Sequence, residues 1–471
     1  MLLIFNKTFF CALNNILLCT TTHYICYYNF HKQINSMFTI IQIIIFIAAL
    51  GCAVYVFTKN IGKIIRNINL GQNVDRTDNK PQRWALMARV AMGQSKMLVR
   101  PVAGIMHLFV YIGFVLINIE VLEIVIDGLF GTHRILSFMG GFYNFLIGFF
   151  EVLALLVLVA VIVFWVRRNV VKIQRFTSPE LKGWAVKDAN YILYIEMVLM
   201  TAVLMMNGAD HALQLQDAHH YTKAGTFPVS DLLFGWLQGT NATTLMVIER
   251  VCWWLHIIGI FLFLNYLPVS KHLHILMAFP NVWYSNLWAK GKFKNNPDVT
   301  REVNLMLDPS AQFDPNAAPP KFGAKDVNDL SWVQLMSAYS CTECGRCTSN
   351  CPANLTGKLL SPRKIMMDTR DRLEEVGKNI DAHGVDFNDG KSLVGDYITA
   401  EELWACTSCN ACVEACPINI DPLAIIMDLR QYLVLEKSEA PQSITGMFTN
   451  IENNGAPWQY SQADRLKWAN E

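Results

Sequence analysis

Five long runs of apolar residues dominate the first 280 positions of the chain. They lie at approximately 37–57, 102–126, 143–166, 190–208 and 245–267. A helix needs about 20 apolar residues to cross roughly 30 Å of hydrocarbon, and these runs have that length. The pattern therefore predicts five transmembrane helices.

The segments between these runs alternate in their content of Lys and Arg. Nine such residues lie between the first and second runs and six between the third and fourth, whereas the other two connections hold only Arg134 and Lys223. Positively charged loops of membrane proteins remain in the cytoplasm. We therefore expect a multi-pass protein of the bacterial inner membrane, with its N-terminus outside and everything after the fifth helix inside.

After the fifth run the pattern is that of short helices separated by loops. Prolines and scattered charges over 281–330 are typical of a linker. Ser361 followed by Pro362 predicts the start of a helix, and Asp421 before Pro422–Leu435 predicts a second one. The sequence predicts an all-α fold, in which a five-helix transmembrane bundle is joined to a mainly helical, two-cluster ferredoxin-like domain.

We expect five segments along the chain. They are a non-native or disordered N-terminal extension over 1–36 with translation starting at Met37, a membrane domain over 37–280, the linker over 281–330, a cysteine-rich domain over 331–436, and a C-terminal arm over 437–471, which a disordered tail would fit equally well.

The second half of the chain contains one cysteine spacing twice. The eight residues are Cys341, Cys344, Cys347, Cys351, Cys406, Cys409, Cys412 and Cys416, and a proline follows the fourth member of each set. This C-x2-C-x2-C-x3-C-P run is the bacterial ferredoxin pattern, in which three thiolates hold one [4Fe–4S] cluster and the fourth reaches the other cluster. We therefore expect two [4Fe–4S] clusters, with Cys416 completing the first set of three and Cys351 the second.

Zinc and disulfide bonds are the alternative uses of these cysteines. Structural zinc normally takes two pairs of ligands rather than two tight quartets. Disulfides are rare in the cytoplasm, where the charge pattern places this domain. Both considerations favour iron–sulfur clusters.

Composition adds two constraints. Of the 471 residues, 53% are hydrophobic and only 16% are charged, which is too apolar for an ordinary soluble protein. The net charge is +1, and no basic face with interleaved aromatic residues occurs, so nucleic acid is not expected as a partner.

Histidines within the apolar runs are candidate haem ligands. A histidine inside lipid requires a specific role, and neutral imidazole is the usual axial ligand of haem iron. His107 and His274 both lie at the cytoplasmic side and form the best pair for a b-type haem. His256 lies 18 residues, or five helical turns, before His274, about 27 Å away if the helix runs straight through Pro268. This spacing suggests a second stacked haem.

The alternatives for these histidines and for the membrane carboxylates remain open. His256 has no evident partner for a second haem, and His211 is only a weak substitute for one. All of these histidines can instead be buried, hydrogen-bonded side chains. Glu151 and Glu196 also fall within the runs, and membrane carboxylates often mark proton or quinone pathways.

Two parts of the chain resemble known protein families. The segment from Leu255-His256 through Pro268 to His274 resembles the cytochrome b (gamma) subunit of respiratory nitrate reductases, which implies five helices and two stacked haems. That family carries two histidines on its second helix, and this chain has only His107 there. Residues 330–436, with Cys341-Thr-Glu-Cys-Gly-Arg-Cys347, resemble the C subunit of heterodisulfide reductase. The resemblance implies a soluble catalytic partner with Cys-Cys-Gly repeats, because this chain has no adjacent cysteine pair.

The combined interpretation is a membrane-bound haem b and iron–sulfur electron-transfer subunit of a quinone-linked oxidoreductase. It would pass electrons between the membrane quinone pool and the soluble partner, which carries the catalytic site. One alternative is a membrane-anchored ferredoxin without haem or quinone chemistry. Another is a redox sensor that signals through the C-terminal arm.

Overall fold

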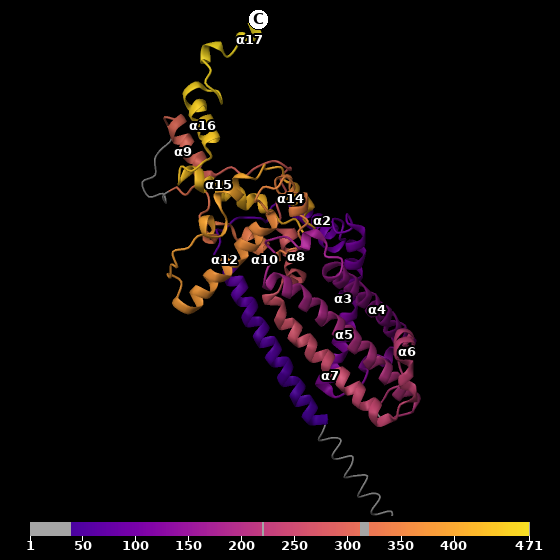
Figure 1. Ribbon diagram of the computed structural model, residues 1–471. Coiled ribbons are helices and arrows are strands. Elements are labelled where there is room, and N and C mark those ends of the chain that lie inside the picture. The colour runs from indigo at the N-terminus through magenta and orange to yellow at the C-terminus, as the bar shows by residue number, and fades with distance from the viewer. Residues whose placement is uncertain (1–38, 219–220, 311–319, 471) are drawn as a thin grey trace, which may run out of the picture. The chain divides into compact units, whose positions relative to one another are not determined.

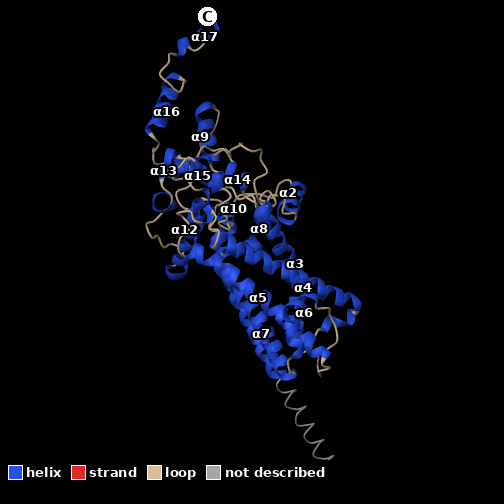
Figure 2. Ribbon diagram, turned by 45° about the vertical axis from the view of Figure 1, so that its right-hand side comes forward, coloured by secondary structure: helices blue, strands red, loops and turns tan. Residues whose placement is uncertain are grey.

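The structure is a computed structural model that describes residues 39–218, 221–310 and 320–470. The expected extension over 1–36 lies outside these residues. The described part is helical, with two isolated bridges and no strand (Figure 2). The all-α prediction is therefore confirmed.

Five helices are long and apolar enough to cross a membrane, as predicted. They are Thr39–Ile68, α3 (Pro101–Phe130), α4 (Gly141–Asn169), α5 (Trp184–Leu215) and Ala242–Val269, of which α7 is the α-helical part, Ala242–Tyr266. Figure 1 shows α3, α5 and α7 running alongside one another.

The ends of these helices follow from local sequence. Pro101 opens α3, where its fixed φ and missing N–H suit the first turn. Gly131 follows the last residue of α3 at φ 67° and donates its N–H to the Asp127 carbonyl at 2.8 Å, which ends the helix. Arg167 and Arg168 lie in the last turn of α4, where positive charge complements the helix dipole.

Residue contacts divide the chain into two compact units, each assembled from several stretches of sequence. The first, here called the bundle unit, comprises the described part of Met1–Thr58 together with Phe109–Val161 and Ile195–Asn265. The second, here called the cysteine unit, comprises Lys59–Leu108, Ile162–Tyr194 and Tyr266–Glu471 in its described part. His107 and His274 therefore belong to the same unit as both cysteine motifs.

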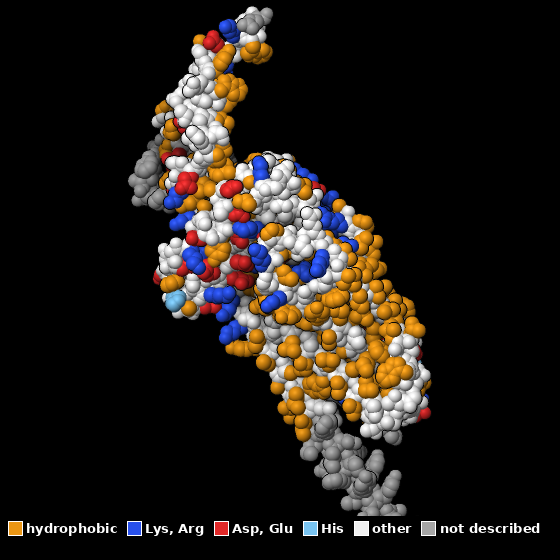
Figure 3. Space-filling model, viewed as in Figure 1, with side chains coloured by type: hydrophobic (Ala, Val, Ile, Leu, Met, Phe, Trp, Pro, Cys, Tyr) orange, Lys and Arg blue, Asp and Glu red, His pale blue; other side chains and the backbone are white. Residues whose placement is uncertain are grey.

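The bundle unit is a packed group of helices covered by apolar side chains. Its buried residues include Ile147, Leu204 and Ile257. A Cβ at Gly113 of α3 would overlap Val157 of α4, so a glycine is needed where these helices meet. On the face that Figure 3 shows, many hydrophobic side chains lie at the surface of these helices, as expected of a surface that faces lipid.

The cysteine unit is built from shorter helices, many of which pack around a large hydrophobic cluster that includes Leu330, Leu335 and Leu429. Its helices are α2 (Lys80–Met87), α8 (His274–Trp283), α9 (Pro297–Leu307), α10 (Trp332–Ser340), α11 (Pro352–Leu355), α12 (Pro362–His383), α13 (Ala400–Trp404), α14 (Ala411–Ala415), α15 (Pro422–Leu435), α16 (Gln442–Asn454) and α17 (Lys467–Asn470); α6 (Pro228–Phe234) belongs to the bundle unit. The two predicted caps are confirmed: Ser361 accepts from the Lys364 N–H, and Asp421 accepts from the Ala424 N–H.

The helix does not continue through Pro268. The expectation that one straight helix aligns His256 with His274 was therefore wrong. Helix α7 ends at Tyr266, Leu267–Val269 form a 3-10 turn, and Ser270 is extended. Proline lacks the N–H that a continuing helix needs and clashes with the preceding turn. A new helix, α8, begins at His274.

Gly323 marks a close crossing of the chain over α15. Its φ is 78°, and a Cβ there would lie 2.5 Å from the Asp428 carbonyl oxygen and closer still to the Tyr432 nitrogen. We predict that Gly323→Ala lowers the free energy of unfolding of the cysteine unit by about 2–4 kcal/mol, through steric overlap added to backbone strain. Thermal melting of the purified protein would measure this.

Gly357→Ala is the matched control. Gly357 has a similar φ of 81°, and no atom lies within 4 Å of the position that a Cβ would take there. Only the backbone strain of about 1 kcal/mol should therefore remain. An equal loss of unfolding free energy in Gly323→Ala and Gly357→Ala would show that the chain does not pass close to α15 at Gly323.

Candidate metal centres

The two cysteine loops have left-handed residues at matching positions. In the first, Glu343 has φ 54° and Gly345 has φ 71°; in the second, Ser408 has φ 57° and Asn410 has φ 59°. These residues occupy matching positions, two and four residues after the first cysteine. Left-handed residues in such loops turn backbone N–H groups inward to form an anion-binding concavity. Both loops are therefore shaped to surround a negatively charged group.

Backbone N–H groups already point at cysteine sulfur atoms. Ser408 N lies 3.4 Å from the Cys406 Sγ, and Ile420 N lies 3.3 Å from the Cys416 Sγ. Hydrogen bonds to thiolate sulfur stabilise the charged form and tune the potential of a bound cluster.

The fourth cysteine of each motif lies near the thiols of the other motif. Cys416 interacts electrostatically with Cys344 and Cys347. Cys351 interacts with Cys406 and Cys412. Each fourth cysteine thus interacts with thiols of the other motif, as the crossed assignment expects, while no three metal-ligating side chains of the described residues lie close enough together to hold a single metal ion.

Burial makes several of these thiols weak acids. It raises the pKa of Cys341 to about 12 and that of Cys416 to about 11. Such thiols are protonated at neutral pH, so binding of a metal centre has to displace their protons. All eight are free rather than paired in disulfides, and their donor set suits iron–sulfur clusters.

A buried carboxylate lies inside the first cysteine loop. Glu343 is only 4% exposed. Its two oxygens bind the Lys271 Nζ at 2.6 Å and the Arg370 guanidinium at 2.8 Å. Burial opposes ionisation, but the two cations hold the pKa of Glu343 below its ordinary value. The loop is therefore fixed by an ion triad from three separate segments.

Lys271 connects this triad to the histidines. Its backbone carbonyl lies 3.1 Å from the Nδ1 of His274. If His274 donates from Nδ1, its Nε2 is left with a lone pair for a metal. Haem-ligating histidines typically use one ring nitrogen in this way.

The rings of His107 and His274 lie at a separation that suits one iron atom, with their planes tilted by 46°. Their centroids are 6.4 Å apart. Two metal–nitrogen bonds of about 2 Å, each followed by about 1 Å from nitrogen to ring centre, span roughly 6 Å. The Nδ1 of His107 is buried and has no hydrogen-bond partner within the described residues. The pair predicted from sequence therefore fits a haem by its spacing.

His272 also lies close to this pair. Its ring is stacked on His274 at 5.5 Å, because Lys271–Leu273 is a 3-10 turn rather than part of a straight helix. The loop residue Arg346 also reaches this region, donating to the carbonyls of Lys96 and Met97 just before α3.

His256 lies in the bundle unit with one ring nitrogen occupied. Its Nδ1 is 3.1 Å from the Leu199 carbonyl, and its buried Nε2 has no partner among the residues described. His211 instead binds Asp231 at 2.7 Å and lies against Phe227. Glu151 accepts from the N–H groups of Val229 and Ser230 at the start of α6, so it has a structural role.

Sequence reasoning missed Lys271, Glu343, Arg346 and Arg370. Glu343 lies within a motif, but a position between two cysteines carries no signal of an ion pair. Lys271 is 72 residues away from it. No periodicity or spacing links such positions, and only the folded structure brings them together.

Comparison with known proteins supports an iron–sulfur role. Residues 340–420 match the family model of a 4Fe-4S dicluster domain. The chain is 30% identical over 467 residues to the probable iron-sulfur-binding oxidoreductase FadF of Bacillus subtilis, covering 93% of this chain and 62% of that protein. It is 27% identical over 438 residues to the EtfAB:quinone oxidoreductase of Syntrophomonas wolfei, covering 87% and 56%.

A shorter relative matches a smaller part of the chain. Over 120 residues the chain is 35% identical to the C subunit of a ferredoxin/F(420)H(2)-dependent CoB-CoM heterodisulfide reductase of Methanosarcina acetivorans, covering 25% of this chain and 60% of that protein. No solved structure matches the chain. The chain spans about three fifths of the length of the first two relatives. The similarities support an iron–sulfur electron-transfer role connected with an oxidoreductase.

Removal of the buried charge in the first loop should affect one cluster selectively. We predict that Glu343→Gln raises the reduction potential of the cluster held by that loop by on the order of 50 mV, because a nearby negative charge disfavours the added electron. A redox titration followed by electron paramagnetic resonance would measure the potentials of both clusters.

Glu414→Gln is the control, because this carboxylate lies inside the second motif but is 56% exposed and paired with Lys290. Solvent screening should make its effect much smaller. A lowered potential in Glu343→Gln, or an equal change in both clusters, would contradict the prediction.

Proposed function

We propose that the chain is a membrane-bound haem b and iron–sulfur electron-transfer subunit of a quinone-linked oxidoreductase. The observation that carries this proposal is the His107–His274 ring pair, 6.4 Å apart, in the same compact unit as two cysteine motifs. A ferredoxin anchored by helices would have no use for paired imidazoles.

The two cysteine loops would hold the [4Fe–4S] clusters in the crossed arrangement. Cys341, Cys344, Cys347 and Cys416 would bind one, and Cys406, Cys409, Cys412 and Cys351 the other. The left-handed loop residues and the inward N–H groups support this assignment. Each cluster would supply a one-electron carrier.

His107 and His274 would hold one haem b. His256, with its buried and unpartnered Nε2 among the described residues, would supply one ligand of a second haem. The nitrate reductase gamma subunit has a second histidine on the helix that corresponds to α3, and this chain has only His107 there. Haem supplies a one-electron iron centre when bound. The protein orients the His274 ring through the Lys271 carbonyl, and the side chain of the same lysine binds the first cysteine loop.

Orientation and partners follow from charge and similarity. The basic connections would place the cysteine motifs on the cytoplasmic side of a bacterial inner membrane. The name of one relative includes quinone, which supports the quinone pool as the membrane partner. Terminal chemistry would belong to a soluble protein with Cys-Cys-Gly repeats.

Purified protein in detergent would test this function. We expect a b-type absorption band after reduction with dithionite. After removal of dithionite, a short-chain quinone should reoxidise both the haem and the clusters. Absence of the haem band would favour the membrane-anchored ferredoxin, and a haem that quinone does not oxidise would contradict the quinone link.

His107→Ala should remove the haem bound by His107 and His274 while both clusters remain. One axial ligand is lost, but no cysteine or cluster loop is altered. Haem content per protein and the cluster signals in electron paramagnetic resonance measure the two effects separately. His211→Ala serves as control and should retain that haem, because His211 is bound to Asp231. Unchanged haem content in His107→Ala would refute the pairing.

A further inference from the structure

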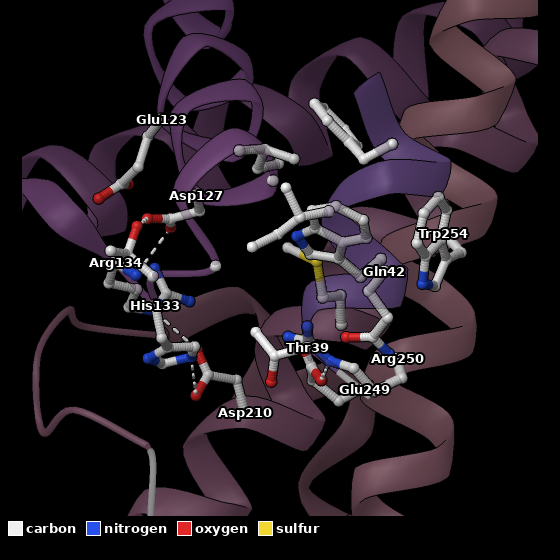
Figure 4. A pocket seen from close by; sticks show the side chains of 18 of the residues that line it. Thr39, Gln42, Glu123, Asp127, His133, Arg134, Asp210, Glu249, Arg250 and Trp254 are labelled. Carbon is white, nitrogen blue, oxygen red and sulfur yellow. Dashed lines mark hydrogen bonds and ion pairs between the residues drawn. The ribbon is translucent and has the colours of Figure 1, made fainter. Parts of the chain in front are cut away.

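A pocket in the bundle unit combines buried carboxylates with aromatic rings. It lies between the first helix, the end of α3 with the connection that follows it, α5 and the start of α7 (Figure 4). Its volume is about 90 Å³. Since one water needs about 10–15 Å³ by this measure, the pocket has room for a single planar ring.

Glu120 is the carboxylate of this pocket with an unused oxygen. Its side chain is 5% exposed, and its buried Oε1 has no hydrogen-bond partner among the described residues. Leaving a buried carboxylate oxygen unsatisfied is costly, and such groups normally have a partner. A ligand hydroxyl in the pocket would supply that missing donor.

The neighbouring acids on α3 are already occupied. Glu123 accepts from the Leu136 N–H at 2.9 Å and from the Tyr143 hydroxyl at 2.8 Å. Asp127 accepts from the N–H of Arg134 at 2.8 Å, and Figure 4 shows both residues on the same side of the pocket. Of these three acids, Glu120 therefore remains to accept a hydrogen bond from a bound molecule.

The charges of the pocket select an uncharged ligand. Arg134 is buried and bound to Asp210 at 2.6 Å and to Asn207 at 3.0 Å. Arg250 is likewise paired with Glu249. Both cations are neutralised and carboxylates are in excess, so an anionic ligand would be repelled.

The other wall of the pocket is aromatic. The ring of Phe46 lies 5.7 Å from that of Trp253, and Trp253 lies 5.1 Å from Trp254. Such walls favour a flat ring by offset or edge-to-face contact. His256, which we assign to the second haem, follows Trp253 by three residues on the same helix, or about one turn.

We infer that this pocket binds the ring of a quinone, and that Glu120 exchanges a proton with it. This rests on the proposed function and names the site where its quinone reacts. Oxidation of one quinol releases two electrons and two protons. The two electrons would pass one at a time to the one-electron carriers of the proposed function. One proton would pass from a quinol hydroxyl to the Glu120 Oε1, and the other would leave to water. Quinone reduction is the reverse.

Glu120 lies on a face of α3 from which a proton can reach the helix end. Glu123 and Asp127 follow at spacings of three and seven residues, which share one helix face. Both line the pocket, together with His133 in the connection after α3. In the proposed orientation this end of the bundle is the outer one.

The test compares Glu120→Gln with wild-type full-length protein. Glutamine keeps the size of the side chain and can accept a hydrogen bond, but it cannot take up a proton. We expect quinone-driven reoxidation of the reduced protein to slow by about 100-fold. Binding of a short-chain benzoquinone, measured by calorimetry, should change by less than about 3-fold, which is below the effect of one lost hydrogen bond.

Two further variants make the result specific. Trp253→Ala should weaken benzoquinone binding by about 10-fold, through loss of ring contact. Asp217→Asn removes an exposed carboxylate just after α5 that is paired with Lys223 and does not line the pocket, and it should leave both binding and reoxidation as in wild type. Haem and cluster spectra serve as the measure of folding in every variant, and if Glu120→Gln does not fold, Trp253→Ala alone decides.

The outcomes separate this site from the proposed function. If quinone does not reoxidise wild-type protein, the proposed function fails, whatever the variants do. If wild type is reoxidised and neither Glu120→Gln nor Trp253→Ala has an effect, quinone reacts elsewhere and only the site is refuted. Slow reoxidation in Asp217→Asn with normal rates in Glu120→Gln would also refute the site.

Discussion

The cysteine unit depends on the pairing of one buried carboxylate. Glu343 lies at 4% exposure between two cysteines of the first loop, where an unpaired charge would be strongly destabilising. Lys271 and Arg370 neutralise it from segments before and after the loop. Because a buried pair is costly unless both partners are held in place, this triad specifies how these segments pack. The same lysine presents its carbonyl to His274, so a single residue sets the positions of a cysteine loop and of an imidazole.

The bundle unit meets a different constraint, because its polar groups must be satisfied without water. Arg134, Asp210, Tyr143 and Glu123 form a connected set of hydrogen bonds. Glu151 binds the first N–H groups of α6. The Oε1 of Glu120 differs from these groups, because it has no hydrogen-bond partner among the described residues. Buried polar atoms without a partner occur at sites that bind a ligand or transfer a proton.

Sequence patterns predicted the helices better than the tertiary contacts between them. The length of the apolar runs predicted the five membrane helices, and Ser361 and Asp421 predicted the first residues of two further helices. These signals lie within short stretches of sequence. The break at Pro268 was visible in the sequence, but the regular spacing of His256 and His274 favoured a straight helix. The Lys271–Glu343 contact and the pocket around Glu120 join distant positions. Their formation depends on how helices pack, which neither periodicity nor motif spacing encodes.

The matched backbones of the two cysteine loops have a consequence for how the domain can vary. Residues 343 and 408 share a left-handed conformation, yet one is a buried glutamate and the other a serine. The backbone conformation at this position therefore does not depend on the charge of the side chain. Two clusters held by similar loops can therefore differ in reduction potential because of a single side chain. Such a side chain can make electron transfer from one cluster to the other favourable or unfavourable without a change in the backbone.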